Sequence, residues 1–227
     1  MSDNKKYAVI VAGGKGVRMG AAIPKQFLPL HGLPIVCHAL QAFAHTIKGI
    51  HLVLVVPPDQ EDSANTIMKS YLGKLNVTTV AGGETRFHSV QNGLKVIKND
   101  GIVFVHDGVR PLVSAKLIHR CYEQAMEKGS AIPVIPVNDS IRMIDSDNNS
   151  VPVNRDMLRI VQTPQTFRTG IILPAFQQEY DDSFTDEATV VEAYGKKVFM
   201  IDGERDNLKI TTPYDLAIAE SLLKASS

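Results

Sequence analysis

The architecture of this chain follows from one stretch near its N-terminus, Tyr7-Ala-Val-Ile-Val-Ala-Gly-Gly-Lys-Gly-Val-Arg-Met-Gly20. Its first five residues form an uninterrupted apolar run, which predicts a strand buried on both faces, as in a parallel sheet covered by helices. The run passes directly into glycines, which let backbone N–H groups approach phosphate oxygens without a Cβ clash. Because ligands of open parallel sheets bind beyond the carboxyl ends of the strands, we expect a ligand site at this turn.

Apolar runs and helical periods alternate along the rest of the chain. Further strands are predicted at 50–56, 76–80 and 102–106, and residues 131–137 are apolar but contain two prolines. Helices are predicted from Pro34 onward and at 59–72, 86–97, 114–128, 169–180 and 185–194, with a late strand at 197–201 and a last helix from Thr212. The alternation predicts one domain over 1–227 of the α/β class, doubly wound and Rossmann-like, with a mostly parallel sheet.

The segment 138–162 breaks this rhythm. A turn cluster, Asp145-Ser-Asp-Asn-Asn-Ser150, separates two β-type segments at 140–144 and 151–153. We interpret the segment as a β-arm that leaves the main sheet. Because such an arm cannot bury its own face, we expect it to pack on a second copy of the chain and to form a homodimer.

Composition excludes several classes of protein. The chain has 24 basic and 24 acidic residues, which argues against a nucleic-acid binder. No apolar run approaches the roughly 18 residues of a membrane helix, and the run at 7–12 is too short for a signal peptide. Cys37 and Cys121 are expected to be reduced thiols, with a single bridge between them as the alternative. Together these features predict a cytoplasmic protein.

The glycine turn does not match the two most common nucleotide motifs. A dinucleotide GxGxxG that starts at Gly14 needs a glycine where Met19 stands, and a Walker A loop needs Ser or Thr after Gly-Lys. What remains is a glycine turn with three cations, Lys15, Arg18 and Lys25. It is either a cradle for phosphates or a tight turn with solvated side chains.

Two other predicted strands also end in polar groups. Asp107 follows the strand at 102–106, and a carboxylate beside bound phosphates usually holds Mg²⁺; the alternative is a turn aspartate. Gly82 and Gly83 precede the helix at 86–97, where the helix N-terminus favours an anion or a base edge; the alternative is an ordinary turn. The histidines lack HxxxH or HExxH spacing, so no zinc site is predicted.

The C-terminal half holds three motifs with ordinary structural interpretations. Gln162-Thr-Pro-Gln165 reads as a proline turn, and Thr185-Asp-Glu187 reads as a helix cap. Asn207 and Lys209 stand just before the cap of the last helix. There is no GxSxG motif and no context for a nucleophilic cysteine.

Taken in order, these motifs resemble the sugar nucleotidyltransferases and, among them, the family of 2-C-methyl-D-erythritol 4-phosphate cytidylyltransferases. The matching segments are Ala12-Gly-Gly-Lys-Gly-Val-Arg-Met-Gly20, Pro24-Lys-Gln26, Gly83-Glu-Thr-Arg-Phe-His-Ser-Val90, His106-Asp-Gly-Val-Arg-Pro111, Gln162-Thr-Pro-Gln-Thr-Phe167, Thr185-Asp-Glu-Ala188 and Asn207-Leu-Lys-Ile-Thr-Thr-Pro213. The resemblance implies a Mg²⁺-dependent transfer from CTP to the sugar-alcohol phosphate, with release of pyrophosphate, in isoprenoid precursor biosynthesis. Ribitol-5-phosphate cytidylyltransferase and a catalytically silent nucleotide-binding protein of this fold are the alternatives.

This sequence departs from the family pattern at a few positions. Gly108 and Val109 stand where two alanines are usual, Ser140 where threonine is usual, and Arg142 where lysine is common. Serine keeps the hydroxyl, and arginine keeps the charge with a different donor geometry. The departures bear on substrate recognition rather than on the class of reaction.

The resemblance assigns the nucleotide side of the site. Ala12, Gly13, Gly14 and Gly16 would wrap the CTP phosphates and ribose, while Arg18 and Lys25 would stabilise charge on the α-phosphate and the leaving pyrophosphate. Gly83 and Ser89 would read cytosine, with Arg86 supporting that loop. Asp107 would hold Mg²⁺ and orient the substrate hydroxyls.

The resemblance also assigns the acceptor side. Arg110, Ser140, Thr189 and Lys209 would line it. Arg155, on the arm, would reach the sugar phosphate bound by the partner subunit, with Lys209 opposite it. The active site would then be shared across the homodimer.

Overall fold

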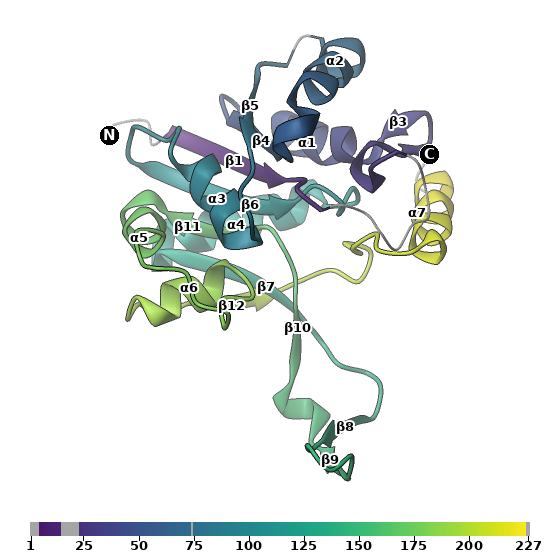
Figure 1. Cartoon of the computed structure of the whole chain (residues 1–227), viewed down its shortest axis with the longest axis vertical. Coiled ribbons are helices and arrows are strands. Elements are labelled where there is room, and N and C mark those ends of the chain that lie inside the picture. The colour runs from purple at the N-terminus through teal and green to yellow at the C-terminus, as the bar shows by residue number, and fades with distance from the viewer. Residues whose placement is uncertain (1–4, 15–22, 74, 226–227) are drawn as a thin grey trace.

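A computed structural model describes residues 5–14, 23–73 and 75–225, and its centre is a mixed, mostly parallel sheet (Figure 1). The strands lie in the order β10–β7–β11–β6–β1–β4–β5, and β12 also pairs with β7. Their bounds are β1 Lys5–Val11, β4 His51–Val56, β5 Val77–Ala81, β6 Gly101–Asp107, β7 Ser130–Pro136, β10 Arg159–Val161, β11 Gln165–Arg168 and β12 Met200–Asp202. The predicted α/β class and mostly parallel sheet are confirmed.

The parallel half of the sheet brings the strand ends together. β1 is central, and it pairs in parallel with β4 on one side and β6 on the other. Val11 lies level with Val55 and with Asp107 in this register. Since β5 runs parallel to β4, all four strands end at the same edge, which is where the glycine turn leaves β1.

Two antiparallel strands interrupt the parallel order, and the sequence analysis missed them. β11 lies between β6 and β7 and is antiparallel to both. It begins at Gln165, the last residue of the motif interpreted as a proline turn, and it is short and mostly polar, so it lacks the apolar run of a buried strand. β10 pairs with the far end of β7, which forms a strand despite Pro133 and Pro136.

Helices cover both faces of the sheet. One face packs on α1 Ile35–Thr46, α2 Glu61–Leu72 and α4 Ala115–Lys128, and the other packs on α3 Arg86–Leu94, α5 Thr169–Ala175 and α6 Glu187–Ala193. Ala8 and Ile10 of β1 face the first layer, whereas Tyr7 and Val9 face the second, as the alternation of side chains along a strand requires. Within the described part of the chain, no helix is both long and apolar enough to cross a membrane.

The C-terminal helix, α7 Pro213–Ala225, closes one end of the molecule. It packs with the small hairpin of β2 Pro29–Leu30 and β3 Leu33–Pro34 in a third apolar cluster. This cluster includes Val109, which follows the end of β6. The C-terminal helix therefore supports the edge of the sheet where the strands end.

Several predicted boundaries were too long. The helices expected at 86–97 and 169–180 end at Leu94 and at Ala175, and the latter contains Pro174. The strand expected at 197–201 forms only at Met200–Asp202. The helix expected from 185 begins at Glu187, because Asp186 accepts a hydrogen bond from the backbone of Thr189 as N-cap.

The segment after β7 forms a hairpin arm. β8 Ile141–Ile144 pairs antiparallel with β9 Ser150–Val153, and Figure 1 shows the arm projecting away from the sheet. The chain returns through a short 3₁₀ helix, Arg155–Met157, before β10 rejoins the sheet. Large apolar side chains of the arm are exposed, including Met143, Ile144 and Met157.

The two cysteines are free thiols inside the core. Cys37 lies on α1 and Cys121 on α4, and both are buried. Burial raises the pKa of each thiol to about 12. A thiol with so high a pKa is not ionised at neutral pH and is a poor nucleophile, so the two residues are structural.

Candidate active site

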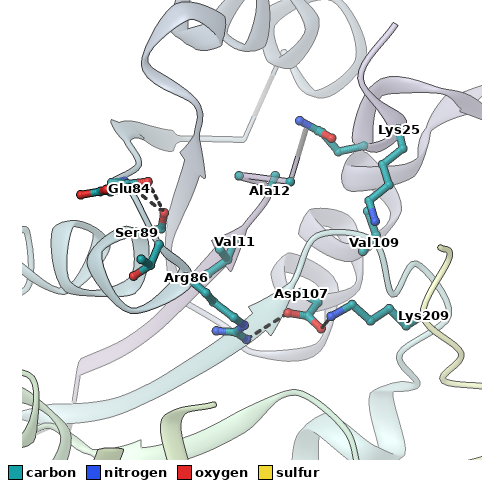
Figure 2. Close-up of a pocket in the computed structure, with 14 residues that line it drawn as sticks. Val11, Ala12, Lys25, Glu84, Arg86, Ser89, Asp107, Val109 and Lys209 are labelled. Carbon is teal, nitrogen blue, oxygen red and sulfur yellow. Dashed lines mark hydrogen bonds and ion pairs between the residues drawn. The ribbon is translucent and has the colours of Figure 1, made fainter. Parts of the chain in front are cut away.

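A cavity, here called the first cavity, opens at the edge of the sheet where β1, β5 and β6 end (Figure 2). The structure brings to it the glycine turn, the start of α3 and Asp107, which the sequence analysis placed together. Its described lining residues are Val11, Ala12, Gly13, Gly14, Lys25, Gln26, Gly83, Glu84, Thr85, Arg86, Ser89, Asp107, Val109 and Lys209.

A second cavity adjoins the first. Its described lining residues are Arg86, Asp107, Arg110, Val161, Gln162, Thr163, Gln165, Thr185, Asp186 and Lys209. Arg86, Asp107 and Lys209 line both cavities and form the wall between them. Two ligands in these cavities would therefore meet at one carboxylate and two cations.

Asp107 is the electrostatic centre of this wall. Arg86 Nη2 lies 2.9 Å from its Oδ1, while Lys209 Nζ lies 2.9 Å and Arg110 Nε 3.6 Å from its Oδ2. Figure 2 shows Arg86 and Lys209 reaching the carboxylate from opposite sides. Burial alone would raise the pKa of Asp107, but the charges of Arg86, Lys209 and Arg110 outweigh it and hold that pKa well below its usual range. The carboxylate is therefore ionised at any physiological pH.

Arg86 also forms an ion pair with a second carboxylate, that of Glu187. Glu187, the first residue of α6, is buried, and its two oxygens accept hydrogen bonds from Arg86 Nη1 and Nη2. Burial raises the pKa of the Glu187 carboxyl, and the charge of Arg86 opposes that shift. The pair joins the start of α3 to the start of α6. The sequence analysis missed this role, because an acidic residue after a helix cap usually interacts with the helix dipole.

The turn before α3 depends on glycine. A Cβ atom on Gly83 would lie 2.4 Å from the Cβ of His88, so no other residue fits without moving the helix. Ser89 Oγ accepts a hydrogen bond from the Gly83 N–H at 3.0 Å, and Thr85 is the N-cap of α3. This close-packed turn leaves the N-terminus of α3 facing the first cavity, as the glycine motif predicted.

Lys25 lies across the cavity from Asp107. It begins the 3₁₀ helix Lys25–Phe27, and a Cβ atom on Gly14 would lie 3.6 Å from its Cε. The lysine side chain therefore lies close to Gly14, and it lines the same cavity as Asp107 (Figure 2). Gly16 and Arg18, which were also predicted to contact CTP, lie outside the described residues.

Three residues predicted for the acceptor side lie elsewhere in the single chain. Ser140 and Arg155 are exposed on the arm, and Arg155 Nη1 donates to the carbonyl of Asn138. The Thr189 hydroxyl donates to the carbonyl of Asp186 at 2.8 Å within the cap of α6. None of the three is among the described residues that line either cavity, whereas Arg110 and Lys209 line the second.

Asp107 is the residue whose chemistry suits a magnesium ion. In the part of the chain that the structure describes, no three or more His, Cys, Asp and Glu side chains are grouped as a metal site. Mg²⁺ in nucleotide enzymes, however, usually takes one or two carboxylates and completes its shell with phosphate oxygens and water. A single ionised carboxylate that faces both cavities fits that donor set. Among the three cations that contact Asp107, Lys209 has the most exposed side chain, at 42%, and it is therefore the one that can most easily move away from the carboxylate.

Comparisons with known proteins agree with this geometry. The IspD family model, described as 2-C-methyl-D-erythritol 4-phosphate cytidylyltransferase, matches residues 7–225. A protein of that name from Phocaeicola vulgatus is 46% identical over 218 residues, which are 96% of this chain and 99% of the relative. One from Porphyromonas gingivalis is 46% identical over 222 residues, which are 97% of this chain and 99% of the relative.

Solved structures of enzymes with the same activity in their names superpose on this chain. The crystal structure of 4-diphosphocytidyl-2C-methyl-D-erythritol synthase from Anaerococcus prevotii superposes with a TM-score of 0.82 at 29% identity, over 97% of this chain and 96% of that one. The 2-C-methyl-D-erythritol 4-phosphate cytidylyltransferase from Thermus thermophilus superposes with a TM-score of 0.78 at 31% identity, over 97% and 99%.

The ion-pair arrangement around Arg86 predicts a pH-dependent loss of stability on its removal. In Arg86→Met, burial would raise the pKa of Glu187 further above its unfolded value, and Asp107 would lose one of the charges that lower its pKa, so the folded variant would bind more protons than the unmodified folded protein. Its stability relative to the unmodified protein would then fall as the pH rises. We expect a loss of roughly 3 kcal/mol at pH 8, as for other broken buried ion pairs, and a smaller loss at pH 5. Urea denaturation at both pH values measures it.

Arg120→Met is the matched control. Arg120 pairs with Glu204 at 3.3 Å, but both side chains are more than a quarter exposed. Removing this pair should cost less than about 1 kcal/mol. An equal loss for Arg86→Met at both pH values would contradict the assigned electrostatics.

Proposed function

The chain belongs to the family of 2-C-methyl-D-erythritol 4-phosphate cytidylyltransferases, and we propose that its two adjoining cavities bind the two substrates of that reaction. The family predicted from the motifs is thereby confirmed. The enzyme joins CTP and 2-C-methyl-D-erythritol 4-phosphate to give 4-diphosphocytidyl-2-C-methyl-D-erythritol and pyrophosphate, in isoprenoid biosynthesis. The observation that supports our assignment of the cavities is the wall that they share, made of Arg86, Asp107 and Lys209.

The reaction needs placement and charge neutralisation more than proton transfer. A phosphate oxygen of the sugar phosphate attacks the α-phosphorus of CTP, the bond between the α-phosphorus and the bridging oxygen breaks, and pyrophosphate leaves with the electron pair. Because the attacking oxygen is already anionic, no general base is required. Such transfers are accelerated chiefly by holding the reactants in line and by stabilising the charge that develops on the phosphates.

In this proposal, the first cavity takes CTP. The backbone of Ala12, Gly13 and Gly14 lies against the phosphates and ribose, and Lys25 stabilises charge on the α-phosphate and the leaving pyrophosphate. Arg18 acts with Lys25. Gly83 and Ser89 read the cytosine, and the tight packing of Gly83 against His88 supports this role because it fixes the turn that carries them.

The second cavity takes the sugar phosphate. Arg110 and Lys209 supply positive charge to the phosphate, and Asp107 accepts hydrogen bonds from the hydroxyls. The contacts of Asp107 with Arg86, Arg110 and Lys209 support this assignment, because they place cations that suit a phosphate beside a carboxylate that suits hydroxyl groups. Ser140 and Thr189 are proposed to complete the acceptor side.

We further propose that Mg²⁺ binds with CTP and that Asp107 is its protein ligand. Bound there, the ion would neutralise negative charge on the phosphates. Arg86 would keep its place on the other carboxylate oxygen, and Lys209 would be free to turn toward an acceptor phosphate. The proposal is supported by the low pKa of Asp107, which keeps the carboxylate ionised.

The arm at 138–162 is proposed to dimerise the enzyme. Met143, Ile144 and Met157 are each more than 60% exposed in the single chain, and an apolar face of this kind is stabilised when a partner covers it. In the dimer, Arg155 of one subunit would reach the sugar phosphate bound by the other. We propose a cytoplasmic location, where CTP is made and where Cys37 and Cys121 remain reduced.

Substrate assays test the proposed function directly. The purified chain with CTP and Mg²⁺ should release pyrophosphate with 2-C-methyl-D-erythritol 4-phosphate and not, or far more slowly, with ribitol 5-phosphate. Preferential use of ribitol 5-phosphate would assign the chain to that enzyme instead. Binding of CTP without turnover of either would indicate a catalytically silent nucleotide-binding protein.

Removing Lys25 tests the charge-stabilising role. We expect Lys25→Ala to lower kcat by about 10²–10³, the usual cost of deleting one donor that stabilises developing charge, and Arg18→Ala to do the same. Thermal unfolding should be nearly unchanged. Lys95→Ala is the control, because the Lys95 side chain is exposed and donates to Asn92 Oδ1, three positions earlier in the chain. A kcat near that of the unmodified enzyme in Lys25→Ala would refute the role.

Subunit mixing tests the shared site. Arg155→Ala and Lys25→Ala subunits are each expected to be weakly active alone. In a mixed dimer, one site would combine an intact Lys25 with an intact Arg155 from the other subunit, so random mixing should restore roughly a quarter of normal activity. Refolding the two variants together and measuring pyrophosphate release checks this. If mixing gives no recovery, each chain works alone.

A further inference from the structure

A closed ring of hydrogen bonds lies next to Asp107, and three of its four residues, all except Arg110, have no role in the proposed function. The Thr163 hydroxyl bonds His106 Nδ1 at 3.1 Å, and His106 Nε2 bonds the carbonyl of Arg110 at 3.0 Å. Arg110 Nη1 donates to the carbonyl of Asn207 at 2.7 Å, and Asn207 Nδ2 donates to the carbonyl of Thr163 at 2.8 Å. The four residues are all buried.

The positions of the protons in the ring follow from the partners. A carbonyl can only accept, so His106 Nε2 carries the ring proton and Nδ1 is an acceptor. The Thr163 hydroxyl therefore donates its single proton to Nδ1, which leaves its oxygen to accept the backbone N–H of Asp107 at 3.1 Å. Each hydrogen bond in the ring therefore has only one possible donor and one possible acceptor.

The ring fastens together three segments that are distant in sequence. They are the end of β6, the turn that carries Thr163, and the segment that leads to Lys209. Gln162 braces the third segment, because its amide donates to the carbonyl of Glu204 and accepts from the Glu204 N–H. Asp107 and Arg110 lie at and just after the end of β6, and Lys209 lies at the end of the third segment. The ring therefore fixes the positions of these three charged groups relative to one another.

We propose that Thr163, acting with His106 and Asn207, is a positioning residue for the transfer reaction. Its hydroxyl holds the main chain of Asp107, so that the carboxylate stays in the wall between the two cavities and keeps Arg110 and Lys209 in reach. Although Thr163 borders the second cavity, its hydroxyl is committed to His106 and Asp107. The inference rests on the role of Asp107 in the proposed function.

Two substitutions of Thr163 distinguish the effect of its hydroxyl from the effect of its side-chain shape. Thr163→Val keeps the branched shape and removes the hydroxyl, whereas Thr163→Ser keeps the hydroxyl. We expect Thr163→Val to lower kcat roughly 10- to 100-fold, as small misplacements of reacting groups do, with CTP affinity by calorimetry changed less than about threefold. Thr163→Ser should stay within about threefold of normal kcat. Normal turnover by Thr163→Val, or equal losses in both variants, would overturn the proposal.

A double variant tests whether the ring acts as a unit. If Thr163 and His106 work through the same bonds, Thr163→Val combined with His106→Asn should lose about as much kcat as the worse single variant. Losses that multiply would mean that the two residues act independently, which contradicts a ring.

A measurement on the unmodified enzyme covers the case in which Thr163→Val does not fold. The ¹⁵N chemical shifts of the His106 ring should report a proton on Nε2 and an unprotonated Nδ1. A proton on Nδ1 would show that the Thr163 hydroxyl is not held as described and would overturn the proposal.

Asp107→Asn separates this inference from the proposed function. We expect this variant to lose at least about 10² in kcat. If it is nearly as active as the unmodified enzyme, the proposed role of Asp107 is wrong. If it is inactive while Thr163→Val is normal, only the positioning role of Thr163 fails.

Discussion

The contact of the Asp107 carboxylate with Arg86, Arg110 and Lys209 is the interaction on which the site depends. A buried carboxylate is costly unless cations and hydrogen bonds surround it, and cations so close together repel one another unless a carboxylate stands between them. Each group therefore needs the others. The sheet supplies the carboxylate, since β6 is buried along its whole length and ends at Asp107, while α3, the turn after β6 and the segment before α7 supply the cations. The glycine turn, the cap of α3 and the packing of α7 serve to bring these segments to one edge.

Much of this arrangement was predictable because it depends on patterns that repeat along the chain. Continuous apolar runs identified β1, β4 and β6, and the shared edge of parallel strands then placed Asp107 beside the glycine turn and Lys25. β11 was not predictable in the same way, because it is short and mostly polar and its place between β6 and β7 is set by tertiary pairing. Glu187 and Thr163 were missed for a related reason. Each looks like an ordinary cap or turn residue in sequence, and each acquires its role from a partner 57 to 101 positions away.

The arm shows where a single chain gives an incomplete account of the site. Ser140 and Arg155 stand on a hairpin that projects from the sheet, and the contacts of Arg155 and Arg142 stay within the arm. Motif resemblance assigns substrate contacts to Ser140 and Arg155, whereas in one chain neither residue lines either cavity. The proposed homodimer would reconcile the two, since the exposed apolar side chains of the arm lie on the same hairpin as the polar residues that the resemblance assigns to the substrate.

The charge balance of the shared wall explains how a wall that we propose contacts two polyanionic substrates is stable without them. Three cations, Arg86, Arg110 and Lys209, meet two carboxylates, Asp107 and Glu187, so the empty wall is nearly neutral. Glu187 and Asp107 hold Arg86 in place from both sides, and Arg110 is buried in the ring with His106, Thr163 and Asn207. The Lys209 side chain is 42% exposed and is the most exposed of the three cations. In the proposed function, it is therefore the cation that would exchange a carboxylate for a phosphate, while the other two would hold the wall in place.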